Sequence, residues 1–192
     1  MTPRFSRLAA AALAVALLGG CAESNAPGSA TSPGAGYQAG DGSFTIWQPA
    51  ERGEPIEISG QSLDGKDIDS ADWAGDVAVV NFWYAACPPC RAEAPDLKAL
   101  SQEFTAVHFL GINPRDDQAA ASAFEDTFEV PYPTILDPSA TIVASMQGKV
   151  PLQAMPTTVV IDKSGRVSGR ILGRIDPEIL KGLIEDALAE SS

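Results

Sequence analysis

The chain has 192 residues, of which 45% are hydrophobic and 20% are charged, and its formal net charge is −12. This length and apolar content are typical of one globular domain with additional segments, and they exclude a chain that is disordered throughout. The acidity excludes the basic footprint that nucleic-acid binding requires, and we interpret it as a solubility feature.

The first residues have the pattern of a secretory signal. Arg4 and Arg7 precede an apolar run at 8–18, which is too short to span a membrane. The run ends in Leu-Gly-Gly before Cys21, an arrangement that resembles a bacterial lipobox. We therefore expect a lipoprotein signal peptide at 1–20 and a lipidated Cys21 that holds the protein on a membrane. A plain signal peptide whose cleavage site contains a cysteine is the alternative.

Residues 21–43 are predicted to form a flexible tether, because they are rich in Ala, Gly, Ser and Pro. The folded domain is expected at 44–192. The three cysteines fit this division. An odd thiol outside the cytoplasm needs an explanation, and lipidation of Cys21 leaves one pair, Cys87 and Cys90.

The folded domain shows a regular series of elements. Two short alternating runs, 55–59 and 66–69, flank an Asp-Gly turn and predict a β-hairpin. Beyond the hairpin, apolar runs alternate with segments of helical periodicity. We expect strands at 77–83, 107–112, 157–161 and 166–172, and helices at 89–104, 116–128, 138–147 and from 177 onward. This order predicts an α/β fold, with a central mixed sheet and helices on both faces.

The two cysteines lie where the first central strand gives way to a helix, in the order Cys87-Pro88-Pro89-Cys90. This placement puts the first sulfur at a helix N-terminus, which favours its thiolate, and the second sulfur one turn in. A Cys-x-x-Cys motif in this position indicates a redox pair.

The motif and its surroundings resemble the TlpA/ResA-like thiol–disulfide oxidoreductases, which are membrane-anchored, thioredoxin-fold members of the AhpC/TSA–redoxin superfamily. The resemblance covers roughly residues 44–190. It is carried by 80–83 with 87–95, by 111–113 with Asp116 and Asp117, by 132–137, and by 155–165. It implies a thioredoxin-like fold with an N-terminal β-hairpin extension and an insertion between the central β and α elements.

The resemblance also implies that Pro156 follows a cis peptide bond and faces the disulfide. A trans proline at the start of an edge strand is the alternative. Two positions depart from the usual patterns. Ala86 stands where the family usually has Trp, and Asn81 stands where cytoplasmic thioredoxins have a buried Asp. Members of the lipoprotein branch often carry a carboxylate just after the motif instead, which here is Glu93.

Each site residue has an expected role. Cys87 is the nucleophile and Cys90 the buried resolving thiol, with Glu93 as the base for Cys90. A solvated surface carboxylate is the alternative for Glu93. Substrate is expected to lie against Met155, Trp83, Pro88 and Pro89. Because no histidine lies inside the motif, we expect a weakly stabilised Cys87 thiolate and a reducing couple.

No metal site and no cofactor beyond the Cys87–Cys90 disulfide are expected. His108 is the only histidine and lies in an apolar run, so we expect it in the core with a satisfied hydrogen bond. Structural zinc usually takes four Cys or His ligands, which this domain does not offer.

The function predicted from the sequence is that of an extracytoplasmic thiol–disulfide oxidoreductase. The resemblance implies a protein disulfide reductase, acting on substrates such as apocytochrome c before haem attachment. A membrane thiol carrier would supply the electrons. A protein disulfide oxidase, a metal chaperone and a peroxidase of the same fold stay open as alternatives. The peroxidase alternative lacks support, because the peroxidase motif Pro-x-x-x-Thr-x-x-Cys is missing around Cys87.

Overall fold

The computed structural model describes residues 37–38, 43–146 and 154–191. The predicted signal peptide, the proposed lipid attachment at Cys21 and most of the predicted tether lie outside these ranges. Among the described residues, none of the helices has the length and apolar character needed to span a bilayer.

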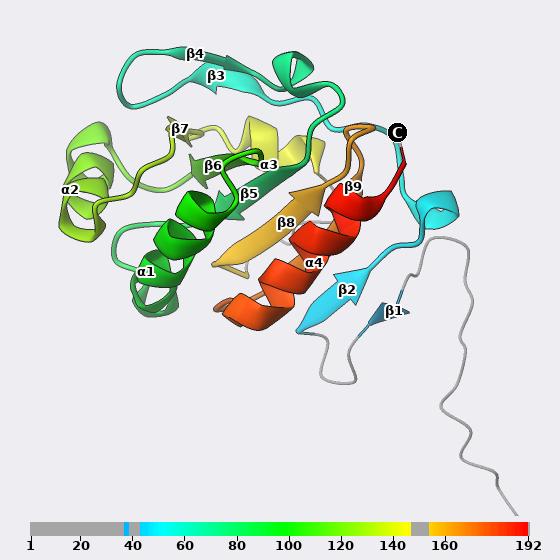
Figure 1. Ribbon diagram of the computed structural model, residues 1–192. Helices are drawn as coiled ribbons and strands as arrows, with labels where there is room; N and C mark the ends of the chain where they lie inside the picture. Colours follow the sequence, from blue (N-terminus) through cyan, green and yellow to red (C-terminus); the bar gives the residue numbers. More distant parts are fainter. Residues whose placement is uncertain (1–36, 39–42, 147–153, 192) are drawn as a thin grey trace, which may run out of the picture. The chain divides into compact units, whose positions relative to one another are not determined.

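Seven strands form one mixed sheet in the order β1-β2-β9-β8-β5-β6-β7 (Figure 1). At its centre, β5 pairs in parallel with β6 and antiparallel with β8. A separate antiparallel hairpin is formed by β3 and β4. The strands are β1 (Tyr37–Gln38), β2 (Phe44–Ile46), β3 (Ser59–Gln61), β4 (Asp67–Asp69), β5 (Ala78–Phe82), β6 (His108–Asn113), β7 (Thr134–Leu136), β8 (Thr157–Ile161) and β9 (Val167–Leu172).

Helices cover both faces of this sheet, because the side chains of β5 alternate between two apolar clusters. Val79 packs in the cluster that contains Leu97 of α1 and Leu180 of α4, whereas Val80 packs with Val143 of α3 on the other face. The α-helices are α1 (Pro88–Glu103), α2 (Gln118–Phe128), α3 (Thr141–Ser145) and α4 (Pro177–Ala189), and short 3-10 helices span η1 (Pro49–Glu51) and η2 (Ser70–Trp73).

The mixed sheet with helices on both faces confirms the predicted fold class, and β8 has the predicted bounds. The first strand of the hairpin was predicted at 55–59, which is wrong. Ile56 N–H donates instead to Gly165 O in the β8–β9 turn, and Ile58 bonds the backbone N–H and the hydroxyl of Ser70, just beyond the end of β4. The hairpin therefore begins only at Ser59.

Three short strands were not predicted. Each of β1, β2 and β7 is only two or three residues long, and three residues are too few to show a periodicity. β2 pairs antiparallel with β9, and β1 pairs antiparallel with β2. Tyr37 and Gln38 lie within the range expected to be a tether.

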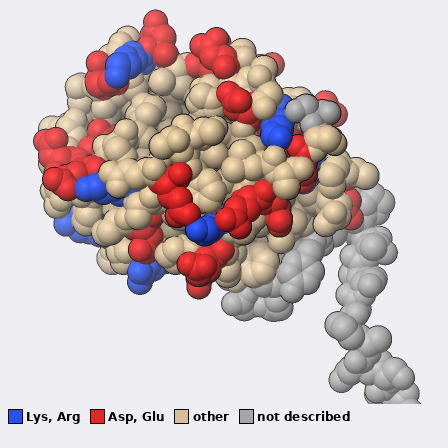
Figure 2. All heavy atoms as spheres, viewed as in Figure 1, with Lys and Arg blue, Asp and Glu red and all other residues tan. Residues whose placement is uncertain are grey.

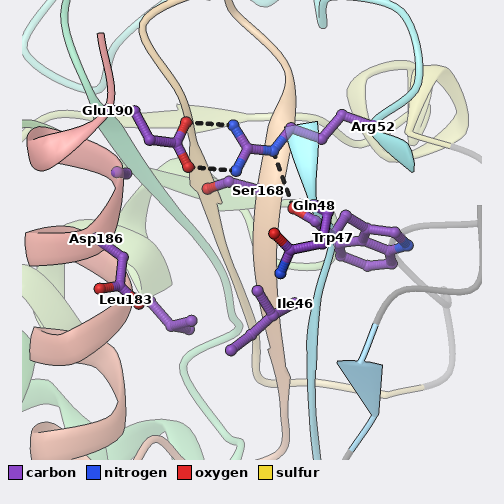
Figure 3. A pocket seen from close by; sticks show the side chains of 9 residues that line it. Ile46, Trp47, Gln48, Arg52, Ser168, Leu183, Asp186 and Glu190 are labelled. Carbon is purple, nitrogen blue, oxygen red and sulfur yellow. Dashed lines mark hydrogen bonds and ion pairs between the residues drawn. The ribbon is translucent and has the colours of Figure 1, made fainter. Parts of the chain in front are cut away.

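A buried guanidinium ties three parts of the domain together, and Figure 3 shows its contacts with Glu190 and Trp47. Arg52 Nη1 donates to Asp162 Oδ2 at 2.7 Å, both Nη atoms donate to the Glu190 carboxylate, and Nε donates to Trp47 O at 3.0 Å. The side chains of Arg52 and Asp162 are only 3% and 2% exposed. These contacts join the segment after η1, the end of β8 and the end of α4. Desolvated charges of this kind stabilise a fold only while they remain paired.

The exposed charges have a different character. Figure 2 shows acidic side chains over much of the visible face, with basic side chains scattered among them. Lys66 and Asp64 form one such exposed pair at 2.6 Å, with side chains 77% and 52% exposed. Solvent screening makes a pair of this kind worth little to stability.

We predict that Arg52→Ala lowers the free energy of unfolding by about 3 kcal/mol, because it leaves a buried carboxylate without its main partner. The matched control, Lys66→Ala, should cost less than about 1 kcal/mol. Urea denaturation of both variants measures the difference. Equal costs for the two substitutions would contradict a stabilising role for the buried pair.

Candidate active site

The chain leaves the buried strand β5 and reaches Cys87 through a four-residue loop. Cys87 is the N-cap of α1, and its Sγ accepts a hydrogen bond from Cys90 N–H at 3.2 Å. Pro88 and Pro89 have no N–H to donate. The proline at the first helical position favours a helix start at this point.

The two cysteines form a disulfide, with 5.2 Å between their Cα atoms. Both are buried, Cys87 at 0% and Cys90 at 2% exposure. The predicted pairing and the predicted burial of Cys90 are therefore confirmed. The disulfide lies in a small cluster with Trp83, Ala94 and Phe124, which connects the start of α1 to α2.

The peptide bond between Met155 and Pro156 is cis, as predicted. Met155 O lies 3.8 Å from Cys87 Sγ, so the turn before β8 faces the disulfide. Met155 and Pro89 are partly exposed, and Pro88 is exposed. These three residues border Cys87 at the surface, and their contact with substrate stays a prediction.

The Trp83 side chain is placed behind the disulfide, and not on the surface. The residue is 3% exposed, and its ring stacks on Phe124 with 4.2 Å between ring centroids. A Cβ added at Gly111 of β6 would clash with Thr134 Oγ1 and lie 2.8 Å from Trp83 Nε1, so a larger residue at this position would disturb both side chains. The structure therefore corrects the assignment of Trp83 to the substrate-contacting surface.

Glu93 is buried inside the domain at 1% exposure, which rules out the alternative of a solvated surface carboxylate. Its Oε1 accepts from Asn81 Nδ2 at 2.8 Å, and its Oε2 accepts from Ile175 N–H at 2.9 Å. Asn81 Nδ2 also donates to Thr158 Oγ1 at 3.0 Å. A buried polar chain thus runs from β8 through β5 to α1 and to the segment before α4.

Burial raises the pKa of Glu93 to about 7, although the hydrogen bonds from Ile175 N–H and Asn81 act in the opposite direction. The carboxyl group lies one helical turn after Cys90. A group that titrates near neutral pH can both accept and release a proton at the pH at which most enzymes work. The Glu93 environment therefore suits the proton transfer expected for the resolving thiol.

The contacts of Asn81 and Ile175 with Glu93 were not found from the sequence. Asn81 could have been suspected, because a polar side chain within a buried apolar run needs a partner. The Ile175 contact uses a backbone amide, which has no sequence signature. A small cavity lined by Cys90, Asn81 and Tyr132 also lies beside this chain.

The expectation for His108 is wrong in one respect. It was expected in the core, but its side chain is 38% exposed because the residue stands at the start of β6. Its Nε2 lies 3.0 Å from Asp76 Oδ2, and its ring stacks on Trp73. Over the described ranges, no group of three or more His, Cys, Asp or Glu side chains is placed to hold a metal ion.

Comparison with known proteins gives the family. The Redoxin family matches residues 49–184, and the chain belongs to that family. It is 27% identical over 125 residues to thiol-disulfide oxidoreductase ResA of Bacillus cereus, covering 64% of this chain and 70% of that protein. It is 31% identical over 142 residues to thiol:disulfide interchange protein HelX of Rhodobacter capsulatus, covering 73% and 74%.

Solved structures agree with this assignment. A secreted thiol-disulfide isomerase from Corynebacterium glutamicum superposes with a TM-score of 0.72 at 29% identity, covering 81% of this chain and 98% of that one. The fold is therefore thioredoxin-like. Together with the Cys87–Cys90 disulfide at the start of α1, these relationships identify the protein as a thiol–disulfide oxidoreductase.

The titration of Glu93 predicts how stability depends on pH. Because its folded-state pKa is raised from 4.5 to about 7, the folded protein holds a proton that the unfolded chain releases between these values. The disulfide form should therefore lose up to about 3 kcal/mol of stability from this group as pH rises through that window.

The Glu93→Gln variant cannot titrate at this position and should lack this loss. Urea unfolding of both proteins at about pH 4.5 and about pH 8 measures the difference. An identical pH dependence in the two proteins would show that Glu93 does not hold its proton in this range.

Proposed function

We propose that the protein is an extracytoplasmic protein disulfide reductase. The main observation in support is that Cys87, at the N-terminus of α1, receives only one hydrogen bond from the first turn of its helix, from Cys90 N–H. A thiolate with little stabilisation makes the reduced form a better electron donor, and the couple correspondingly reducing.

The first step is attack by the Cys87 thiolate on one sulfur of a substrate disulfide. A bond forms between Cys87 Sγ and that sulfur, and the second substrate sulfur leaves as a thiolate. The surface beside Cys87 includes Pro88 at the start of α1 and Met155 in the turn before β8. A partner protein that contacts both residues can place its disulfide in line with the attacking Cys87 sulfur.

The second step is attack by Cys90 on Cys87 Sγ. Glu93 takes the Cys90 thiol proton, the Cys87–Cys90 bond forms, and the remaining substrate sulfur leaves. The substrate gains two electrons and, after protonation, two thiols, while the protein becomes the disulfide. An external dithiol must then return two electrons, and we assign this to a membrane thiol carrier.

Burial of the oxidised pair supports selectivity for protein partners. Cys87 has no exposed surface in the disulfide form, so a small thiol in solution has poor access to its sulfur. A partner that docks on the surrounding surface can bring its thiolate close. The resemblance to the TlpA/ResA-like proteins supports apocytochrome c as one such substrate.

The location rests on the sequence of the N-terminal region. A positive segment, an apolar run and Leu-Gly-Gly-Cys21 support export and lipid attachment. The structurally similar thiol-disulfide isomerase from Corynebacterium glutamicum is a secreted protein, which supports a place outside the cytoplasm. The acyl chains at Cys21 would keep the catalytic domain near the membrane.

A trapping experiment tests the exchange mechanism. Cys90→Ala should accumulate a mixed disulfide between Cys87 and its partners, because the resolving step is lost. Cys87→Ser should lose disulfide reduction by about a thousandfold or more. Affinity purification after acid quenching, followed by mass spectrometry of linked peptides, measures the first result. Failure of Cys90→Ala to trap any partner, under conditions in which the wild type is active, would refute the two-step mechanism.

Lipid attachment is tested separately. Cys21→Ser should move the protein from the membrane fraction to the soluble extracytoplasmic fraction, because it removes the attachment atom. Metabolic labelling with a fatty-acid analogue should mark the wild type and not the variant. Ser24→Ala is the matched control and should leave both results unchanged. Membrane retention of an unlabelled wild type would count against the lipid anchor.

A further inference from the structure

The peptide groups of Ala85, two residues before Cys87, contact two side chains of opposite charge. Ala85 N–H donates to Asp116 Oδ2 at 2.5 Å, and Ala85 C=O accepts from Arg91 Nη1 at 3.3 Å. Asp116 lies in the loop after β6, and Arg91 lies in the first turn of α1. The exchange mechanism above uses neither side chain.

The orientation of the Asp116 carboxylate is fixed by Asn113. Asn113 is fully buried at the end of β6, and its Nδ2 donates to Asp116 Oδ2 at 2.8 Å. Its Oδ1 accepts from the N–H groups of Arg115 and Asp116, each at 3.0 Å. The sheet thus holds a half-buried negative charge against the loop that carries Cys87.

Arg91 is held less tightly. It is exposed, and its guanidinium also lies over the Phe128 ring, with 5.0 Å from Cζ to the ring centroid. Within the described residues, it forms no ion pair with a carboxylate. Its charge is therefore not cancelled by a direct partner, but solvent screens it more than it screens Asp116.

We propose that Asp116 and Arg91 are positioning residues that set the reduction potential of the Cys87–Cys90 couple, and that they act in opposite directions. The inference deepens the proposed function, on which it rests only in taking this pair to be redox-active. Reduction adds two electrons to a neutral disulfide and leaves Cys87 partly as a thiolate. The nearby charges affect the thiolate and leave the energy of the disulfide almost unchanged.

The sign follows from Coulomb's law. Both charged side chains contact the Ala85 peptide groups, which lie two residues from Cys87, so their charges lie on the order of 10 Å from the Cys87 sulfur. A unit charge at such a distance shifts an equilibrium by about three- to tenfold at a protein surface. The Asp116 carboxylate disfavours the Cys87 thiolate and makes the couple more reducing. Arg91 favours the thiolate and makes the couple more oxidising, with a smaller effect because it is exposed.

Other charged groups lie on the same elements, and Asp116→Asn and Arg91→Gln leave them unchanged. Glu93 lies behind Cys90 on α1, Arg115 lies over the Tyr84 ring, and Asp117 caps α2. Arg174 pairs with Asp96 at 3.3 Å. Of the acidic members of this set, Asp117 is the best control, because it neighbours Asp116 but its Oδ1 accepts from Ala120 N–H.

The experiment measures the potential of the full protein by equilibration with glutathione at about pH 9.5, where reduced Cys87 is mostly thiolate, without any substrate. Asp116→Asn keeps an acceptor for Ala85 N–H and removes the charge. This variant should raise the equilibrium ratio of reduced to oxidised protein by about three- to tenfold. That ratio corresponds to a potential about 15–30 mV more oxidising. Arg91→Gln should shift the potential in the opposite direction by a smaller factor. The double variant should fall between the two single variants.

Asp117→Asn removes the same charge from the neighbouring residue and should change the equilibrium by less than about twofold. An unchanged potential in Asp116→Asn would overturn the proposal. An equal shift in Asp117→Asn would also overturn it. A shift in Asp116→Ala without one in Asp116→Asn would overturn it too, because it would show that loop geometry, and not the charge, sets the potential. Because no substrate is involved, failure here leaves the exchange mechanism intact, and failure of the trapping experiment leaves this result interpretable.

Discussion

In the part of the chain that the structure describes, Cys87 Sγ accepts one hydrogen bond, from Cys90 N–H in the first turn of α1, at the point where a buried strand gives way to a helix. That contact requires the helix to begin at Pro88, and it places the second sulfur one turn in, within bonding distance of the first. Met155 O, just before Pro156, lies 3.8 Å from the same sulfur. The redox pair therefore depends on the positions of β5, β8 and α1, which place the two sulfurs together at the start of the helix.

The same elements are joined by a buried polar chain that has both a structural and a chemical consequence. A buried carboxylate is costly unless it is hydrogen-bonded, and Glu93 meets that condition through Asn81 and the Ile175 amide. Thr158 extends the chain to β8. The contacts that anchor α1 to the sheet thus also hold a group with a pKa of about 7 close to the resolving cysteine. The stability of the fold and the proton transfer to Glu93 depend on the same hydrogen bonds, so a substitution at Glu93 affects both.

The central strands and the position of the cysteine pair could be predicted because uninterrupted apolar runs and a Pro-bearing helix start are local signals. The family pattern added the cis bond at Pro156, which no local signal specifies. The burial of Glu93 could not be derived from its position, because it depends on Asn81 and Ile175, which are 12 and 82 residues away in sequence. Trp83 was expected against substrate, but its indole is buried and stacks on Phe124 of α2, 41 residues away in sequence. Local sequence patterns do not predict long-range contacts of this kind.

The proposed direction of electron flow follows from a sulfur that has one amide donor and no histidine beside it. The reduction potential of the Cys87–Cys90 couple in the unmodified protein, measured by equilibration with a dithiol buffer, tests that claim directly. The proposed reductase requires a potential near that of reducing couples of this fold, about −270 mV. A value near about −120 mV, as in strongly oxidising couples, would contradict it and identify the protein as an oxidase.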